Sequence, residues 1–282
     1  MKKILVLGDI SRKKISDTVF RLKPWLEKYV AIEIVNLSKE KKIEIEKKDA
    51  EIAVVFGGDG AILSTCRALG RDQIPIIGVH MGKFGFLAEV MERDVCVALE
   101  KIFRGDYMIR KRMLLFCHIE RDGKIITETT GINDAVISRS SLSRLIAIKL
   151  RIDGEEVATY RADGLIVSTP LGSTAHSLSA GGPLVTPDLR AFIIVPMCPH
   201  TLTNRPLVVS SDVRIEMELL SDLSGAGLTV DGQVFTELEA GDKVRVVRSD
   251  IEVQMIDTGT RTFYGVLQEK LRWGGQPNYG DN

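Results

Sequence analysis

The sequence predicts a protein of two parts, an open and mostly parallel α/β domain followed by a β-sandwich-like domain. Residues 1 to about 110 alternate short apolar runs with helical patterns, which is typical of a parallel sheet with helices on both faces. After Arg112 the apolar residues partly follow the two-residue period of strands. A chain of 282 residues has room for about two domains, and 44% hydrophobic residues can fill two cores.

The first part alternates strands and helices. Its apolar runs predict strands, and helical patterns lie between them: strands at Ile4–Leu7, Ile32–Val35, Ile52–Phe56 and Ile74–Val79, helices over residues 16–29 and after Gly60. The first run is too short for a signal peptide, so we expect it to be the first strand. In a sheet of this kind, ligands bind at the carboxyl ends of the strands.

A glycine-rich turn, Gly57-Gly-Asp-Gly60, lies at one of these carboxyl ends. Such a turn directs bare backbone N–H groups and a helix N-terminus outward, and its glycines lack the Cβ atoms that would keep phosphate away. The turn does not have the G-x-x-x-x-G-K-[ST] pattern, and Leu63 stands where a dinucleotide fingerprint has its third glycine. It therefore predicts a phosphate site of another kind.

Asp59 makes this turn unusual, because a carboxylate inside a phosphate cradle repels its ligand. It is tolerable there if it also binds Mg²⁺ or accepts the proton of an attacking hydroxyl, which indicates phosphoryl transfer. The alternative is a tight turn in which Asp59 caps the helix. The turn alone leaves both interpretations open. A second glycine-bearing loop, His80 to Phe86, would lie beside the first if their strands are neighbours.

Short runs rich in β-branched residues predict the strands of the second part, namely Leu114–Ile119, Ile125–Thr130, Leu145–Ile152, Glu156–Tyr160, Val213–Leu219, Leu228–Val230, Lys243–Val247 and Ile251–Ile256. Asp153-Gly154 and Asp231-Gly232 are hairpin signals, and two packed sheets are expected. Residues 263–272 have a helical pattern. The predicted domains are 1–112 and 113–257, followed by a segment 258–273 that packs on the first domain and a flexible tail at 274–282.

One segment of the second part, Arg161 to Pro183, does not resemble scaffold. Only Leu165–Val167 has the apolar character of a core strand, and hydroxyl side chains alternate with glycines over the rest, at Ser168, Thr169, Ser173, Thr174, Ser177 and Ser179. A purely structural loop seldom needs so many hydrogen-bonding groups. The segment is suited to surround a polar ligand that carries ring nitrogens, hydroxyls and phosphates.

The composition limits the partners of the protein. Lys+Arg and Asp+Glu balance at 38 each, so no overall field holds nucleic acid or an acidic membrane. The basic spot Arg110–Arg112 and the charge run Lys39–Lys48 are expected to be solvated, and no segment approaches the roughly 20 apolar residues of a membrane span. Four widely spaced cysteines without a C-x-x-C pattern favour reduced thiols, so we expect the protein in the cytoplasm.

The motifs of the chain resemble those of the NAD kinases in order and approximate spacing, from about residue 50 to Trp273. They are Gly57-Gly-Asp-Gly60, Asn133-Asp134, Asp163 to Pro183, Cys198-Pro-His200 with Arg205-Pro206, and Asp231-Gly-Gln233. The long motif from Asp163 to Pro183 is highly specific. The glycine turn alone is not, because diacylglycerol kinases, sphingosine kinases and phosphofructokinases also carry it.

The resemblance implies transfer of phosphate from ATP, or from polyphosphate, to the 2′-hydroxyl of the adenosine ribose of NAD, which gives NADP. It implies an active site between an α/β domain and a β-sandwich domain, a homodimer or homotetramer, and Mg²⁺ or another divalent metal that arrives with ATP, with no protein ligand for it identified. Asp59 matches the proton acceptor. The matched or expected nucleotide contacts are Gly57, Gly58, Gly60, Phe86, Asn133, Asp134, Arg144, Arg161, Asp163, Thr174, Ala175, His176, Ser179 and Gln233.

Three positions depart from the family pattern. Ala61 replaces Thr or Ser, Asp134 replaces Glu, and His176 replaces Tyr. None removes a group that the chemistry requires, so they bear on substrate affinity and preference. Two alternatives stay open: a lipid or sphingoid kinase with the same glycine turn, which needs an apolar groove for acyl chains, and a dinucleotide-binding sensor without activity. The presence of Asp59 and of the polar segment favours the NAD kinase interpretation over both.

Overall fold

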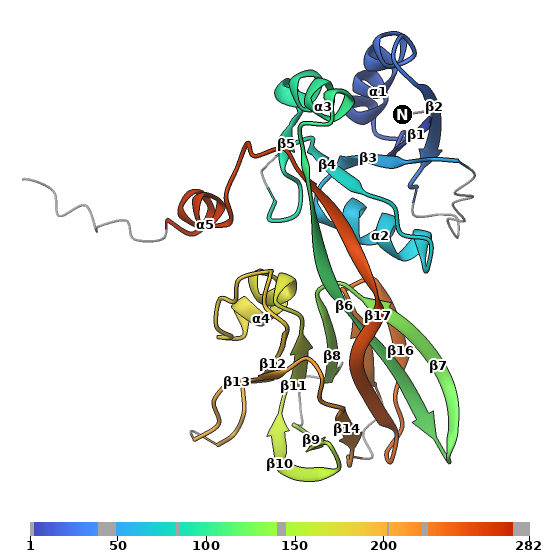
Figure 1. Cartoon of the computed structure of the whole chain (residues 1–282). Helices are drawn as coiled ribbons and strands as arrows, with labels where there is room; N and C mark the ends of the chain where they lie inside the picture. Colours follow the sequence, from blue (N-terminus) through green and yellow to red (C-terminus); the bar gives the residue numbers. More distant parts are fainter. Residues whose placement is uncertain are drawn as a thin grey trace, which may run out of the picture. The chain divides into compact units, whose positions relative to one another are not determined.

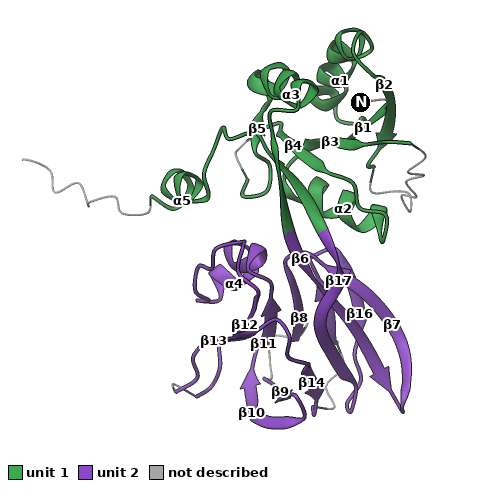
Figure 2. Ribbon diagram, in the orientation of Figure 1, with its two compact units in different colours: residues 1–111, 253–282 green, residues 112–252 purple. Residues whose placement is uncertain are grey.

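The computed structural model describes residues 3–38, 49–82, 85–139, 145–201, 203–221 and 225–272. The chain forms two compact units, one of residues 1–111 with 253–282 and the other of residues 112–252 (Figure 2). We call them unit 1 and unit 2. The chain passes between them within two long strands, β6 (Met108–Arg121) and β17 (Lys243–Asp257). The domain boundaries given above stay a prediction, because compactness alone does not define a domain that folds independently.

Unit 1 contains the parallel sheet that the sequence predicts. Its strands are β1 (Lys3–Gly8), β2 (Ala31–Asn36), β3 (Ile52–Gly57) and β4 (Ile76–His80), and they lie in the order β4-β3-β1-β2. All three pairings within this order are parallel. The short strand β5 (Val90–Met91) and the end of β17 also pair with β4. The carboxyl ends of β3 and β4 are therefore neighbours.

Helices cover both faces of this sheet (Figure 1). Helix α1 (Lys13–Leu26) and helix α3 (Val95–Arg104) share one core with Ile4, Val6 and Val54, and α2 (Asp59–Leu69) buries Ile62 and Leu69. Helix α3 and the 3₁₀ turn η1 (Glu92–Asp94) before it were not predicted from the sequence. The final helix α5 (Phe263–Leu271) belongs to unit 1, and the hydroxyl of Thr262 caps it by accepting the N–H of Gly265 at 3.1 Å.

Unit 2 contains two packed sheets, as predicted. One joins β10 (Glu155–Ala162), β9 (Ile146–Ile152), β14 (Ile215–Leu219), β17, β6 and β7 (Lys124–Gly131). The other has the order β13 (Leu207–Ser210), β12 (Ala191–Met197), β11 (Gly164–Ser168), β8 (Asp134–Arg139), β15 (Ala226–Val230) and β16 (Val234–Glu237), and all its pairings are antiparallel. One core joins the sheets, with Leu115 and Leu150 from the first and Ile137, Leu165 and Phe192 from the second.

Three Asp-Gly dipeptides lie in tight turns of unit 2. Both residues have positive φ at Asp122-Gly123 (50° and 74°), Asp153-Gly154 (51° and 86°) and Asp231-Gly232 (53° and 65°). Positive φ at both positions belongs to the type I′ turn, whose twist matches that of a hairpin. The second and third hairpins were predicted and are confirmed. The first was not predicted.

Strands β8 and β12 of the second sheet were not predicted, and both are covered on their two faces, whereas the unpredicted edge strands β13 and β16 have every second residue exposed. Along β8 the residues Ala135 and Ile137 face the common core, whereas Val136 belongs to a second cluster with Ile166 and Val195. Strands buried on both faces are nearly continuous apolar runs, so the alternation that identifies a strand is missing. The second face is covered by the polar segment, through η2 (Leu171–Thr174), α4 (His176–Ser179) and the loop to Val185.

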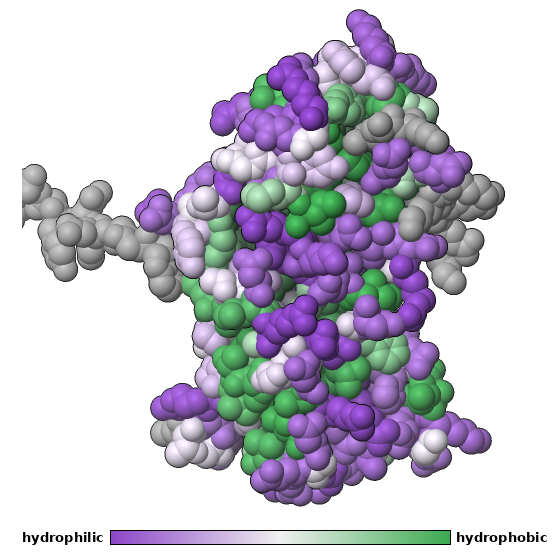
Figure 3. Space-filling model, in the orientation of Figure 1, coloured by the Kyte–Doolittle hydropathy of each residue, from purple (hydrophilic) through white to green (hydrophobic). Residues whose placement is uncertain are grey.

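Several smaller expectations can be compared with the structure. Arg110 and Arg112 form ion pairs with Asp257 and Asp188, and Figure 3 shows hydrophilic residues over much of the face in view.

No helix of the described residues is long and apolar enough to cross a membrane. The four cysteines are free thiols, two buried, one half-buried and Cys198 exposed. The charge run at 39–48 and the tail at 274–282 lie outside the described residues.

Candidate active site

The carboxylate of Asp59 is held by the second glycine-bearing loop. Its Oδ2 atom accepts the N–H of Phe86 at 2.8 Å, and Oδ1 accepts those of Leu87 and Ala88 at 3.0 and 3.4 Å. The loop and the glycine turn meet because β3 and β4 are parallel neighbours, so the conditional expectation that they lie side by side is confirmed. Asp59 is the first residue of α2, and it is half-buried.

The helix-cap alternative for Asp59 is wrong. The N-cap of α2 is Gly58, and no side chain caps the helix there. The carboxylate turns instead to another loop, which leaves the N-terminus of α2 without a carboxylate cap. Gly58 and Gly60 are exposed, and a Cβ atom at Gly58 would meet nothing within 4 Å. A helix N-terminus of this kind, with reachable backbone, is suited to bind phosphate.

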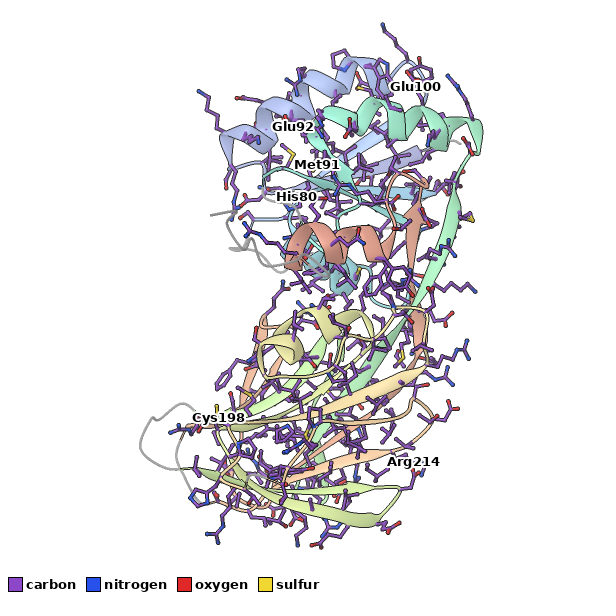
Figure 4. The ribbon with its side chains drawn as sticks, turned by 90° about the vertical axis from the view of Figure 1, so that its left-hand side faces the viewer. His80, Met91, Glu92, Glu100, Cys198 and Arg214 are labelled. Carbon is purple, nitrogen blue, oxygen red and sulfur yellow. The ribbon has the colours of Figure 1, made fainter. Side chains whose placement is uncertain are left out.

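His80 ends β4 next to this turn, opposite Met91 and Glu92 of the following segment (Figure 4). Its ring is buried, and Nδ1 accepts the N–H of Gly82 at 3.0 Å. Burial lowers the pKa of His80, although the negative charge of Asp59 acts in the opposite direction. The imidazole is therefore neutral near pH 7 and donates only through Nε2.

Two lysine side chains contact the second glycine-bearing loop. Nζ of Lys14 donates to the carbonyl of Met81 at 2.6 Å and forms an ion pair with Glu92 at 3.3 Å. Nζ of Lys270, from α5, lies 5.6 Å from the centre of the Phe86 ring. Positive charge thus lies close to the loop that holds Asp59, which favours anionic ligands there.

In unit 2, Asp231 organises the other candidate residues. Its carboxylate accepts the N–H groups of Ile132, Asn133 and Asp134, with the shortest contact, 2.7 Å, to Asn133. The carbonyl of Asn133 in turn accepts from the N–H of Thr169 at 2.8 Å. Asp231 and Thr169 therefore both bond to the backbone of residues 132–134. These bonds fix the positions from which the Asn133 and Asp134 side chains extend.

Asp134 is buried in this arrangement, with 4% of its surface exposed. Burial, together with the negative charge of Asp231, raises the pKa of Asp134 to about 7, and the backbone N–H of His176 acts against that rise. Oδ1 of Asn133 is also buried and has no hydrogen-bond partner among the described residues. Since buried polar atoms are nearly always paired, the two side chains are suited to bind a polar ligand.

The remaining candidates of unit 2 fall into two groups at opposite ends of β11. One group lies at the end of β11 where Ser168 pairs with Asp134. The polar segment that covers this end contributes Thr174, Ala175, His176 and Ser179, and the turn after β15 contributes Gln233. Arg161 and Asp163 lie at the other end, about 16 Å away along the strand. Arg144 lies outside the described residues.

Asp163 has an ion pair that the sequence did not indicate. Nε and Nη2 of Arg139 reach its Oδ1 atom at 2.8 and 2.7 Å. Asp231 and Gly85 are two further residues that shape the candidate sites and were not among the predicted site residues. Asp231 was noted as part of a hairpin turn and of the motif Asp231-Gly-Gln233, but no role in the site was predicted for it. For Arg139 no signal exists, because its pairing depends on the register of β8 against β11.

Two family sequence models match the chain. The ATP-NAD kinase N-terminal domain matches residues 12–107, and the ATP-NAD kinase C-terminal domain matches residues 132–258. The NAD kinase of Geotalea daltonii is 41% identical over 253 residues, which cover 90% of this chain and 89% of that protein. The NAD kinase of Geobacter metallireducens is 39% identical over 281 residues, 97% of this chain and 99% of that protein.

Solved structures of the same kind are similar in fold. A yeast NADH kinase complexed with NADH has a TM-score of 0.84 and 22% identity, over 100% of this chain and 90% of that one. An NAD kinase from Archaeoglobus fulgidus in complex with ATP has a TM-score of 0.77 and 26% identity, over 97% of this chain and 100% of that one. Both similarities extend over nearly the whole chain.

Proposed function

The chain belongs to the NAD kinase family, and we propose that its own residues transfer the terminal phosphate of ATP to the 2′-hydroxyl of NAD, with Asp59 as the proton acceptor. The reaction gives NADP. The observation that carries it is the match of both family domains, which together span most of the chain. Nothing in the comparisons favours a lipid kinase or a sensor without activity.

Asp59 suits the role of base because it is oriented before the substrate arrives. Three backbone N–H groups fix its carboxylate, and the side chain is only half-buried, so it remains reachable. In phosphoryl transfer the enzyme mainly positions the groups and neutralises charge. The bond from the 2′-oxygen to phosphorus forms while the bond to the leaving ADP breaks, and the hydroxyl proton passes to the carboxylate.

The N-terminus of α2 supplies the second element of the proposal. Gly58 leaves room beside the backbone at the N-cap, and the positive end of the helix stabilises negative charge on a phosphate. Ala61 has no hydroxyl, so this part of the site would act through backbone groups alone. The lysines beside the second loop add to the local positive charge.

Mg²⁺ would be held mainly by the phosphates of ATP. Among the described residues, no group of three or more His, Cys, Asp or Glu side chains could hold a metal ion. In enzymes that use ATP, one or two carboxylates commonly bind Mg²⁺ together with phosphates and water. In this proposal the carboxylate of Asp59 receives the hydroxyl proton, so the ion would be held by phosphates and water, and it would neutralise charge on the phosphates.

Asp134 would bind the ribose and adenine region of NAD with Asn133. An ionised carboxylate accepts two O–H bonds from a vicinal diol, whereas the protonated form loses much of that capacity. Since the pKa of Asp134 is about 7, the binding-competent charged form would predominate only above neutral pH.

We therefore expect the KM for NAD to rise about tenfold when the pH is lowered from 8 to 6, because the ionised fraction of Asp134 falls by that factor. Asp134→Ala should raise the KM at pH 8 at least tenfold, since a charged acceptor worth about 1.5 to 3 kcal/mol is lost, and should remove the pH dependence. Asp134→Glu should remain active. Initial-rate kinetics at both pH values test this, and an unchanged KM in the Ala variant would place Asp134 outside the site.

The proposed function is tested by incubating the purified protein with ATP, Mg²⁺ and NAD and measuring NADP with an NADP-specific dehydrogenase. Parallel reactions with polyphosphate, and with NADH as acceptor, establish the donor and acceptor preferences. Sphingosine and diacylglycerol serve as control acceptors and should give no product. Binding of NAD without NADP from any donor would instead indicate a sensor. Light scattering on the same sample tests the expected homodimer or homotetramer.

A further inference from the structure

The approach of the second loop to Asp59 depends on a glycine. Gly85 precedes the three residues whose N–H groups hold the carboxylate, and it is buried. A Cβ atom at Gly85 would stand 2.6 Å from Cγ of Asp59 and 2.7 Å from its Oδ2 atom. These distances are shorter than the sum of the van der Waals radii of the two atoms, so any side chain at position 85 would displace the carboxylate.

The backbone conformation does not require this glycine. Gly85 has no positive φ, so an alanine could adopt its backbone angles without strain. Gly82 lies three residues earlier in the same loop and is exposed, and a Cβ atom at that position would meet nothing within 4 Å. What distinguishes Gly85 is therefore the space that the carboxylate occupies.

The contacts of the loop determine which part of the carboxylate is left for chemistry. An ionised carboxylate has about four lone-pair positions, and the loop occupies two on Oδ1 and one on Oδ2. Among the described residues nothing else bonds to this carboxylate, so the remaining position lies on Oδ2. A loop that came less close would leave the carboxylate free to rotate, and a rotated base no longer meets the hydroxyl in the geometry of proton transfer.

We propose that Gly85 is a positioning residue for the phosphoryl transfer, which it supports by letting the loop backbone approach and fix the Asp59 carboxylate. This rests on the proposed function, in which Asp59 is the base. The competing explanation is that Gly85 only allows dense packing of the loop and has no connection with turnover.

The test compares Gly85→Ala with Gly82→Ala, which adds the same methyl group to the same loop where it meets nothing. Gly85→Ala should lower kcat at least 20-fold while the KM for NAD changes less than threefold, because orientation of the base is lost and nucleotide binding is kept. Gly82→Ala should stay within twofold of the wild type in both constants. A kcat for Gly85→Ala within threefold of the wild type would overturn the proposal.

A second measurement separates positioning from packing. In an Asp59→Asn background, Gly85→Ala should reduce the residual kcat less than threefold, because the group through which it acts is already disabled. If Gly85→Ala lowered kcat by the same factor in the Asp59→Asn protein as in the wild type, Gly85 would act independently of Asp59.

Thermal unfolding keeps the proposal testable if Gly85→Ala folds poorly. Asp59→Ala removes the carboxylate that the new methyl group would meet, so the two substitutions together should be as stable as Asp59→Ala alone. An equal loss of stability with and without the carboxylate would contradict the contact. This coupling is measured without turnover, so it stays informative even if the wild-type protein makes no NADP, a result that would count against the proposed function alone.

Discussion

Asp59→Asn should lower the kcat for NADP formation by about 10² to 10⁴-fold, the usual contribution of a positioned general base. The substitution keeps the size of the side chain and one acceptor oxygen, but it cannot take up the hydroxyl proton. The KM for NAD should change little, because the base is expected to act in the transition state more than in binding. Steady-state rates with ATP, Mg²⁺ and varied NAD give both constants.

The matched control for this variant is Asp17→Asn, an exposed position on α1 in the same unit, which removes the same charge from the surface. Its kcat should stay within twofold of the wild type. The amide nitrogen in Asp59→Asn cannot accept an N–H bond from the loop, so far-ultraviolet circular dichroism should establish that the fold is kept. Turnover above half of the wild-type value in Asp59→Asn would exclude Asp59 as the base.

Asp134→Asn should make the protein more stable at pH 8. The pKa of Asp134 is about 7 in the folded protein, against 3.8 for the ordinary carboxyl, because burial and Asp231 disfavour its charge. The folded state therefore holds its proton more tightly than the unfolded chain, and stability is lost as the pH rises from about 4 to about 7. The loss amounts to about 4 kcal/mol, and asparagine carries no charge at either pH.

Urea unfolding at a series of pH values from 4 to 8 measures this effect. The two proteins should have nearly equal free energies of unfolding near pH 4, and the variant should gain steadily above it. Glu237→Gln, at an exposed position of β16, is the control and should change the free energy by less than about 0.5 kcal/mol at any pH. Parallel curves for wild type and Asp134→Asn would mean that Asp134 is ionised at little cost.

Stability and binding would then make opposite demands on Asp134. The charge that binds the ribose diol is the charge that the buried position disfavours, and Asp231 adds to the cost. Asp231 itself cannot be dispensed with, because its carboxylate satisfies three N–H groups at the start of β8. Residues that weaken the fold in this way are expected at functional sites.

Local sequence patterns were sufficient for the first sheet and for two hairpins. Ile52–Phe56 is buried and apolar because it is a central parallel strand, and the glycine turn after it follows from the same pattern. Asp153-Gly154 and Asp231-Gly232 were recognised because type I′ turns require positive φ at both positions. In each case the residues that carry the signal are adjacent in the chain.

Features that depend on distant parts of the chain could not be predicted. The N–H groups that hold Asp59 lie 27 to 29 residues away, and those that hold Asp231 belong to a strand start 97 to 99 residues earlier. Strands β8 and β12 are covered on both faces, so they lack the two-residue alternation by which the strands of unit 2 were recognised. The position of Asp163 beside Arg139 follows from the register of two strands, which no local pattern states.

The division of unit 1 into two stretches of sequence has a consequence for how the protein is made. Its core contains Ile256, and its strand β4 pairs with Met255, so this core is incomplete while the ribosome has not yet released those residues. Unit 2 is one uninterrupted stretch, residues 112–252, and has no such dependence. Domains generally fold as units during synthesis, the N-terminal one first. If the two units fold separately, this chain is expected to complete them in the reverse order, since the unit that contains the first strand also needs residues near the end of the chain.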